Sequence, residues 1–161
     1  MSAKIVGLED LSERSKQLRA AGKKLVATNG CFDLLHVGHV RYLQAARALG
    51  DLLAVGLNGD RSVRDLKGKG RPITAERDRA EILAALECVD LVTIFPEMRA
   101  TQFIAASNPA IYVKGGDYSP ETLNEEERAL LKEIGAEVRL IPFEAGYSTS
   151  GLLAQIRKGA S

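Results

Sequence analysis

The chain has 161 residues, 45% of them hydrophobic and 27% charged, and its 22 Lys and Arg against 21 Asp and Glu give a formal net charge of +1. This length predicts a single, free-standing domain over residues 1–161 that buries a sheet-based core without disulfides or metals. The balanced charge gives no reason to expect nucleic acid or a membrane surface as a partner, so any anion site must be local.

The sequence also lacks the marks of export or of membrane insertion. The first residues contain no apolar stretch of signal-peptide length, and no run approaches the roughly 18 apolar residues of a membrane span. Cys31 and Cys88 are far apart in sequence, which gives no support to a zinc cluster or a disulfide framework. A cytoplasmic protein is therefore expected, with Cys31 read as a small turn residue rather than a reactive thiol.

In chain order, helical and apolar strand patterns alternate. The first pattern is a helix over about 11–22, which Gly22 would end, and the remaining core runs over about 24–158. Five apolar runs predict buried strands: 25–29, 52–57, 91–95, 110–113 and 137–141. Helical patterns separate or follow them: 40–49, 75–86, 100–106, 125–134 and 149–158. This alternation predicts an α/β fold, a doubly wound five-stranded parallel sheet of Rossmann-like type covered on both faces.

Both histidines of the chain fall where the first predicted strand passes into a helix. They enclose a glycine in His36-Val37-Gly38-His39. Backbone N–H groups and the helix dipole attract anions at such a position, and two imidazoles beside it suggest a triphosphate held for reaction. The alternative is a pair of turn histidines without a task. Asp33 is either a ligand for substrate or metal or a residue that stabilises the turn.

Three later segments also carry candidate site residues. Lys67, Lys69 and Arg71 lie in a glycine-rich stretch that reads as a mobile loop, either closing over phosphates or simply solvated. Two consecutive glycines follow the fourth strand in Lys114-Gly115-Gly116-Asp117-Tyr118, which suggests close approach of a ligand rather than a plain turn. Ser148 or Thr149 is placed to cap the last helix.

The string from Gly30 to His39, GCFDLLHVGH, resembles the HxGH signature of the nucleotidyltransferase superfamily, in its cytidylyltransferase-like branch. The likeness continues through 58–60, 78–83, 89–90, 114–118 and 148–150, and so covers nearly the whole chain from Lys24. The KGGDY string at 114–118 is similar to the adenylyltransferase domain that makes ADP-heptose. The resemblance implies strand order 3-2-1-4-5, which places the two histidines at the switch point of the sheet.

The resemblance also assigns roles to residues. The catalytic group is His36, His39 and Lys67, with Lys69 as the alternative loop lysine. The nucleotide-binding residues are Asn29, Gly30, Cys31, Phe32, Gly38, Lys114, Gly115, Ser148, Thr149 and Ser150. The substrate-binding residues are Asp33, Lys69, Arg71, Arg79, Gly116 and Asp117. Alternatively, Arg79 is an exposed helix residue paired with a carboxylate at helical spacing. Asp90 matches another family position, but it could equally serve as a residue at the entry of a strand.

The chain departs from the family pattern at three positions. Ser150 stands where threonine is typical and keeps the hydroxyl, whereas Phe143 and Glu87 stand where cytidylyltransferases for glycerol phosphate carry arginine. Both missing arginines favour the heptose branch.

The resemblance thus implies transfer of AMP from ATP to D-glycero-β-D-manno-heptose 1-phosphate, giving pyrophosphate and ADP-heptose for lipopolysaccharide or another surface glycan. Mg²⁺ is expected mainly on the triphosphate, since no metal-binding cluster stands out in the sequence. The nucleoside triphosphate and the sugar phosphate are the expected partners, and a homodimer is the expected assembly. Two alternatives stay open: a CTP-dependent cytidylyltransferase for glycerol 3-phosphate or another alcohol phosphate, and a nucleotide-binding protein without turnover.

Overall fold

The computed structural model describes residues 2–116, 123–142 and 146–159, and one parallel sheet forms their centre. Its strands are β1 (Leu25–Gly30), β2 (Leu52–Asn58), β3 (Leu91–Phe95), β4 (Ile111–Gly115) and β5 (Glu137–Ile141). They lie in the order β3-β2-β1-β4-β5. The predicted doubly wound sheet and its 3-2-1-4-5 order are therefore confirmed. The first four residues of the central strand β1 are all buried.

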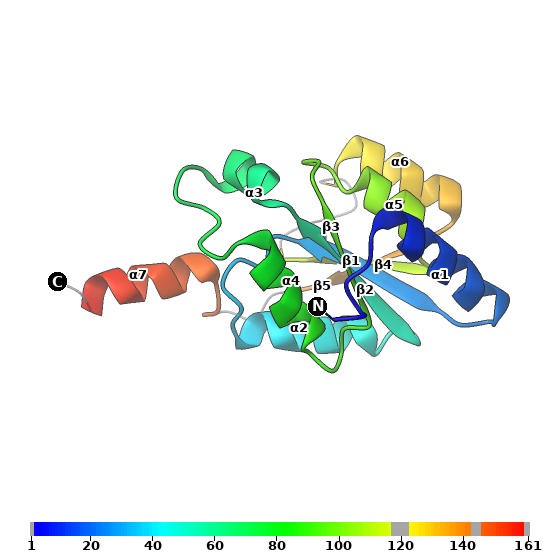
Figure 1. Ribbon diagram of the computed structural model, residues 1–161, viewed down its shortest axis with the longest axis horizontal. Coiled ribbons are helices and arrows are strands. Elements are labelled where there is room, and N and C mark those ends of the chain that lie inside the picture. The colour runs from blue at the N-terminus through cyan, green and yellow to red at the C-terminus, as the bar shows by residue number, and fades with distance from the viewer. Residues whose placement is uncertain (1, 117–122, 143–145, 160–161) are drawn as a thin grey trace.

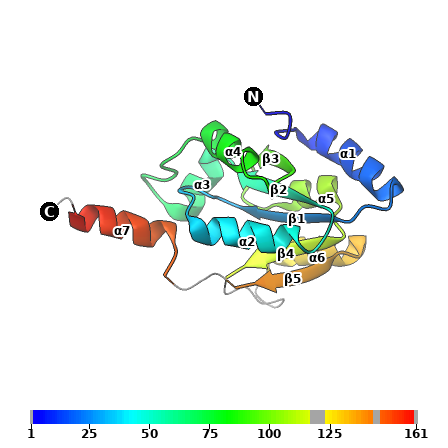
Figure 2. The same cartoon turned by 90° about the horizontal axis from the view of Figure 1, so that it is seen from below.

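Helices cover the sheet on both sides (Figure 1, Figure 2). They are α1 (Leu8–Ala20), α2 (Val37–Arg47), α3 (Asp60–Lys67), α4 (Glu76–Ala84), α5 (Thr101–Ser107), α6 (Glu125–Ile134) and α7 (Thr149–Gly159). Apolar residues of α2 and α4 form one core cluster with the sheet, and those of α1, α5 and α6 form a second. The two clusters are what a strand buried on both faces requires.

Adjacent residues of β1 show how the sheet serves both clusters. Val26 packs on the α2 side and Ala27 on the α5 side, and both are fully buried. A glycine in β2 lets α5 approach closely, because a Cβ on Gly56 would lie 2.6 Å from the ring of Phe103. The sheet is therefore a rigid platform for the loops at its carboxyl edge.

The boundaries of the predicted elements hold to within about three residues. Both α1 and α2 start three residues earlier than predicted, and because α2 starts at Val37, Gly38 and His39 belong to its first turn. The eight-residue helix α3 was not predicted, because Val63 is its one buried apolar residue in a polar segment. Lys67 is consequently the last residue of a helix, at the start of the predicted loop.

The last helix, α7, leaves the body of the molecule at the end where β1 and β2 finish (Figure 1, Figure 2). Its residues are all exposed or partly exposed. Within the described ranges, no helix is both long and apolar enough to cross a membrane.

Candidate active site

The turn after β1 runs from Cys31 to His36 and lies at the carboxyl edge of the sheet. Phe32 adopts a left-handed backbone conformation with φ of 45°, yet its side chain is buried. Its ring fits against Gly30, where a Cβ would come within 2.9 Å of it, and meets the ring of His39 edge-on at 5.4 Å between centroids. Gly30 and Phe32 therefore shape the turn that carries the histidines.

The two histidines lie against each other at the start of α2. Their rings stack with centroids 3.9 Å apart and planes inclined by 25°. The backbone N–H of His36 donates to Nδ1 of His39 at 3.4 Å, which leaves Nε2 of a neutral His39 as the hydrogen-bond donor. Nδ1 of His36 is buried and has no hydrogen-bond partner among the described residues.

Burial sets the protonation of this pair. It lowers the pKa of His36 below the ordinary value. Burial, together with the charge of a protonated His36, lowers the pKa of His39 to about 4. Both rings are therefore neutral near pH 7 without a bound anion, and an anion would favour the protonated form.

Gly38 brings a second segment of the chain onto the histidines. A Cβ at this position would lie 2.8 Å from Cβ of Tyr147 and 2.9 Å from the ring of His36. The Tyr147 ring faces that of His36 at 6.3 Å, and the guanidinium of Arg41 lies 5.7 Å from the Tyr147 centroid. The absence of a side chain at Gly38 thus permits the segment before α7 to contact the start of α2.

That segment also places the hydroxyls of the last motif. The side chain of Ser148 accepts a hydrogen bond from the N–H of Gly151 at 2.9 Å, which confirms the predicted cap of α7. Thr149 donates to the carbonyl of Leu34 in the histidine turn at 3.2 Å, and Ser150 is exposed. The N-terminus of α7 therefore adjoins the N-terminus of α2.

Asp33 turns its carboxylate towards the chain rather than towards the surface. Its side chain is 1% exposed and accepts from Nε of Arg71 at 2.6 Å, from the N–H of Ile73 at 2.8 Å and from that of Thr74 at 3.0 Å. Burial alone would raise the pKa of Asp33, but these hydrogen bonds outweigh it and hold the pKa below its ordinary value. Asp33 thus binds a segment about forty residues away in the sequence.

Arg79 is buried, with 1% of its surface exposed. The alternative interpretation of Arg79 as an exposed helix residue is therefore wrong. Its guanidinium, 0% exposed, donates to the carbonyls of Cys31 and Asn58 at 2.7 and 2.8 Å. It also binds the Asp60 carboxylate and the carbonyl of Thr74, each at 2.8 Å. The guanidinium thus binds four acceptors within the protein.

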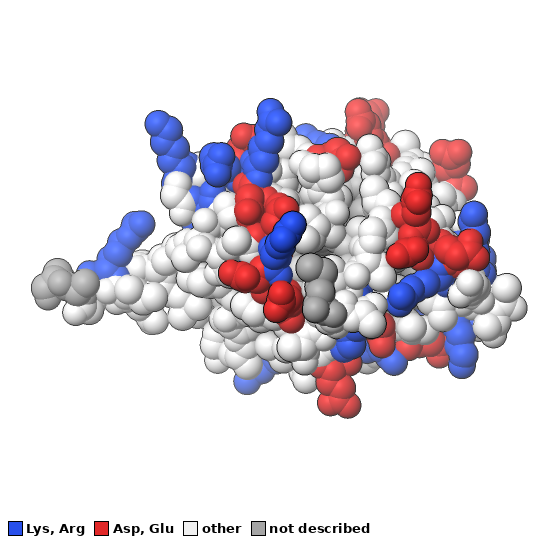
Figure 3. Space-filling view, viewed as in Figure 1, with Lys and Arg blue, Asp and Glu red and all other residues white. Residues whose placement is uncertain are grey.

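The residues from Lys67 to Ala75, which we call the basic loop, join α3 to α4. Lys67 and Lys69 are exposed, whereas Arg71 is half-buried. Figure 3 shows Lys and Arg side chains gathered over α3 and this loop. Burial raises the pKa of the Cys31 thiol, and the charges of Lys67, Arg79 and Arg71 act against it. All three positive charges therefore favour the thiolate form of Cys31 in the turn after β1.

Lys114, at the end of β4, belongs to a separate buried group. Its ammonium lies 3.5 Å from the Glu127 carboxylate and donates to Oδ1 of Asn29 at 3.1 Å, which also accepts from the hydroxyl of Tyr112. Burial lowers the pKa of Lys114 against the opposing effect of Glu127. The Glu127 carboxylate therefore already balances the charge of Lys114.

The glycines after Lys114 close β4. Gly115 is the buried last residue of the strand, and Gly116 has φ of 73°, a conformation that favours glycine. Asp117 and Phe143 lie outside the described residues. Glu87 is exposed in the turn before β3, and Asp90, as its strand-entry alternative predicted, accepts from the N–H of Leu53 at 2.8 Å.

Sequence reasoning missed several residues around the site. Glu127 and Tyr147 carry no motif of their own. Thr28, just before the motif, bonds to the hydroxyl of Tyr42 at 2.7 Å and so ties β1 to α2. Their partners are distant in sequence. The spacing of apolar residues on α6 could have indicated Glu127, because Glu127 and Leu131 are one helical turn apart and are both buried.

The described residues hold no group of three or more His, Cys, Asp or Glu side chains arranged to bind a metal ion. Asp33, the carboxylate in the histidine turn, already has three donors. The side chains around the turn therefore do not form a cage for Mg²⁺, and an ion that enters with a triphosphate would be bound through its phosphate oxygens.

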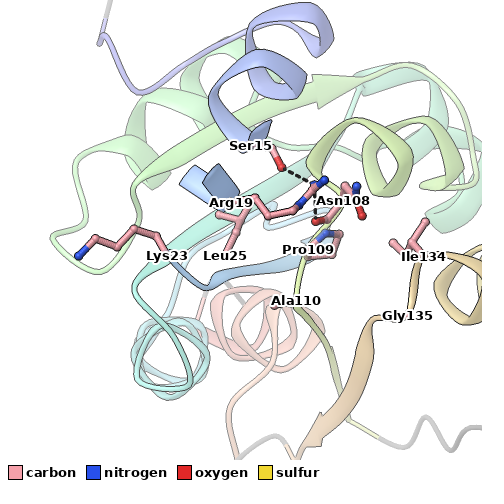
Figure 4. A pocket seen from close by; sticks show the side chains of 9 residues that line it. All are labelled: Ser15, Arg19, Lys23, Leu25, Asn108, Pro109, Ala110, Ile134 and Gly135. Carbon is pink, nitrogen blue, oxygen red and sulfur yellow. Dashed lines mark hydrogen bonds between the residues drawn. The ribbon is translucent and has the colours of Figure 1, made fainter. Parts of the chain in front are cut away.

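A cavity of about 210 Å³ lies at the other end of the sheet, between α1 and the start of β4 (Figure 4). Arg19, which lines it, donates to the carbonyl of Asn108 at 3.3 Å, and Ser15 donates to the carbonyl of Ser107. These bonds join α1 to the end of α5. The cavity is thus remote from the histidine turn.

Comparison with known proteins agrees with this geometry. The family model described as cytidylyltransferase-like matches residues 27–156, a span that includes the histidine turn, the basic loop and the start of α7. The chain belongs to the cytidylyltransferase-like family.

Longer bacterial proteins match almost the whole chain. The bifunctional protein HldE of Geotalea uraniireducens is 51% identical over 158 residues, which cover 98% of this chain and 32% of that protein. The bifunctional protein HldE of Rhodopseudomonas palustris is 50% identical over 159 residues, with the same coverage. This cytidylyltransferase-like chain thus spans about a third of the length of the curated relatives it matches.

A solved structure shares the fold. The crystal structure of the lipopolysaccharide core biosynthesis protein from Thermoplasma volcanium superimposes with a TM-score of 0.63 at 27% sequence identity. It covers 76% of this chain, and 98% of the Thermoplasma chain is included.

Proposed function

We propose that this chain transfers the AMP group of ATP to a sugar 1-phosphate, D-glycero-β-D-manno-heptose 1-phosphate, and releases pyrophosphate. The observation that carries the proposal is the stacked pair His36 and His39 at the N-terminus of α2.

In the proposed reaction, a phosphate oxygen of the sugar phosphate attacks the α-phosphorus of ATP. The new P–O bond joins sugar phosphate to AMP, and the bond between the α-phosphorus and the bridging oxygen to the β-phosphate breaks. Negative charge moves onto pyrophosphate. Hydrogen bonds from His36 and His39 that strengthen as this charge grows would lower the barrier.

The two helix N-termini would hold the triphosphate between them. Those of α2 and α7 are joined by the bond from Thr149 to the carbonyl of Leu34. Both present the positive ends of helix dipoles, and Ser148, Thr149 and Ser150 add hydroxyl donors. Gly38 lets the segment before α7 pack against the start of α2, which brings the two N-termini together.

The basic loop would supply the remaining positive charge. We assign the catalytic cation to Lys67, the last residue of α3, as the family resemblance implies. Lys69, two residues further, is the alternative. Mg²⁺ is proposed only as a companion of the triphosphate, bound through phosphate oxygens.

The group around Lys114 suits a different part of the ligands. Its charge is already paired with Glu127, so it would act through directed hydrogen bonds more than through net attraction. Asn29, Gly115 and Gly116 adjoin it, and we assign this edge to the nucleoside. The KGGDY resemblance supports ATP and heptose phosphate as the pair, and the similarity to a lipopolysaccharide core biosynthesis protein supports a sugar phosphate of that pathway.

We also propose that the protein works in the cytoplasm, where ATP is available, and as a homodimer. Light scattering on the purified chain tests the second statement, since a homodimer has twice the mass of 17.4 kDa given by the sequence.

Pyrophosphate release tests the function directly. ATP and CTP would each be offered with heptose 1-phosphate and with glycerol 3-phosphate, in the presence of Mg²⁺. Release with ATP and heptose 1-phosphate alone is expected. Release with CTP and glycerol 3-phosphate would instead favour the alternative suggested by the family's description, and release with no pair would contradict both.

A further inference from the structure

The base and the tip of the basic loop differ in how they are held. The tip, from Lys67 to Gly70, is exposed, and Gly68 and Gly70 have φ of 96° and 85°. Glycines give this part wide conformational freedom. The base, from Arg71 to Thr74, bonds to two buried charged side chains.

Asp33 makes the first of these attachments. Its carboxylate receives the guanidinium of Arg71 and the backbone N–H groups of Ile73 and Thr74. Because Asp33 stands three residues before His36, the same short turn carries both the histidine and the anchor of the loop. Charge-assisted bonds of this kind are stronger than neutral ones.

Arg79 makes the second attachment, through the carbonyl of Thr74 at 2.8 Å. It binds the carbonyls of Cys31 and Asn58 with the same guanidinium. Thr74 is therefore held through its N–H by Asp33 and through its carbonyl by Arg79, with the ends of β1 and β2 as the support.

We infer that Asp33 is a positioning residue: it fixes the base of the basic loop to the histidine turn, so that the lysines of the tip stand over the phosphate site. On this view Asp33 touches neither substrate nor metal. The effect on catalysis rests on the proposed function, whereas the anchoring itself does not.

Limited proteolysis tests the anchoring without any assay of activity. Trypsin cleaves after Lys67 and Lys69 only when the tip of the loop can enter the protease. Asp33→Asn keeps the size of the side chain but replaces an acceptor by an NH₂ group that faces donors. Cleavage at these two bonds, mapped by mass spectrometry on the full chain, is expected to be faster by about tenfold.

Asp90→Asn is the matched control. Asp90 also accepts from an arginine, Nε of Arg47 at 3.0 Å, and from a backbone N–H, that of Leu53 at 2.8 Å. It lies at the amino ends of β2 and β3, away from the loop. Unchanged loop cleavage in this variant is expected; equal acceleration would mean general destabilisation and would overturn the inference, as would wild-type cleavage in Asp33→Asn.

Arg71→Gln covers the case in which Asp33→Asn fails to fold. It removes one of the three donors and leaves both backbone bonds, so it should give a smaller acceleration. Cleavage of this variant at the wild-type rate, with Asp33→Asn unfolded, would also overturn the anchor.

Kinetics separate positioning from contact with substrate. If Asp33 acts through the loop, Asp33→Asn lowers kcat with little change in the KM for sugar phosphate, and it adds little to Lys67→Ala in the double variant. A raised KM and additive losses would show direct contact with substrate. Absence of turnover in the wild type would refute the proposed function and leave the proteolysis result to decide the anchor.

Discussion

The imidazoles of His36 and His39 stack 3.9 Å apart where β1 passes into α2. Two positive charges at that separation would repel by about 4 kcal/mol at an effective dielectric constant of about 20. The pair therefore carries at most one proton readily until an anion arrives, and then the phosphates supply the opposite charge. The fold thus keeps both histidines neutral until a polyanion binds beside them and favours their protonation.

This geometry predicts a loss of stability in mild acid. The pKa of His39 is about 4 in the folded protein, against the ordinary histidine value of 6.5 that applies to the unfolded chain. As pH falls from 6.5 towards 4, the unfolded chain binds a proton that the folded chain does not, so folding stability decreases over this interval. The partial exposure of His39 limits the expected loss to about 1 to 2 kcal/mol.

Urea unfolding at pH 7.5 and pH 4.5 measures this loss. His39→Asn cannot titrate, and its side-chain oxygen can accept the N–H of His36. The difference in unfolding free energy between the two pH values should therefore be smaller in this variant by that amount. Equal acid sensitivity of the two proteins would contradict the role given to His39.

Replacement of either histidine by alanine should abolish most of the turnover. The lost donors act on charge that develops in the transition state, and loss of one such donor costs about a hundredfold to a thousandfold in kcat. Circular dichroism should show an intact fold, since neither ring belongs to the two core clusters. Substantial activity in the double variant would exclude the proposed mechanism.

Gly38→Ala should separate activity from stability. The added Cβ falls 2.8 Å from Cβ of Tyr147, so the segment before α7 has to move away from α2. Turnover should fall by about tenfold to a hundredfold, because small displacements of catalytic groups are costly. Thermal stability should change little, since alanine favours a helix by about 0.5 to 1 kcal/mol over glycine.

Gly159→Ala is the control for this change. It also replaces a helical glycine, but a Cβ at Gly159 meets nothing within 4 Å. Turnover of this variant should equal that of the wild type. If both variants have normal turnover, contact between Tyr147 and the start of α2 is not required for catalysis.

Lys67→Ala and Lys69→Ala discriminate between the two loop lysines. Both side chains are exposed, so neither change should lower stability measurably. Lys67→Ala should lower kcat more than it raises the KM for sugar phosphate, whereas Lys69→Ala should have a smaller effect. The reverse result, measured by pyrophosphate release, would transfer the catalytic role to Lys69.

The sequence predicted the fold well because apolar spacing reports burial. All five strands were recognised, since each is an apolar run between polar segments. The polar helix α3 was missed for the opposite reason. The positions of His36 and His39 were also predicted, because a glycine between them marks a strand-to-helix turn.

The partners of buried polar side chains were not predictable. Arg79 looks like a surface residue on α4, but its acceptors include the carbonyls of Cys31, Asn58 and Thr74. Backbone carbonyls have no signature in the sequence. Asp33 likewise binds N–H groups forty residues away, which only the folded chain brings within reach.

Arg79→Ala should therefore destabilise the protein strongly. The change leaves the carbonyls of Cys31, Asn58 and Thr74 without their donor, and a buried acceptor left unsatisfied costs about 1 to 3 kcal/mol. Asp60 adds less, because its side chain is 37% exposed and water can solvate its carboxylate. Arg77→Ala, on the same helix but exposed, should stay within about 0.5 kcal/mol of the wild type. Urea unfolding of the three proteins at pH 7.5 gives both differences. A loss below about 1 kcal/mol for Arg79→Ala would mean that water replaces its bonds, and Arg79 would then be free to contact a substrate phosphate as the family resemblance implied.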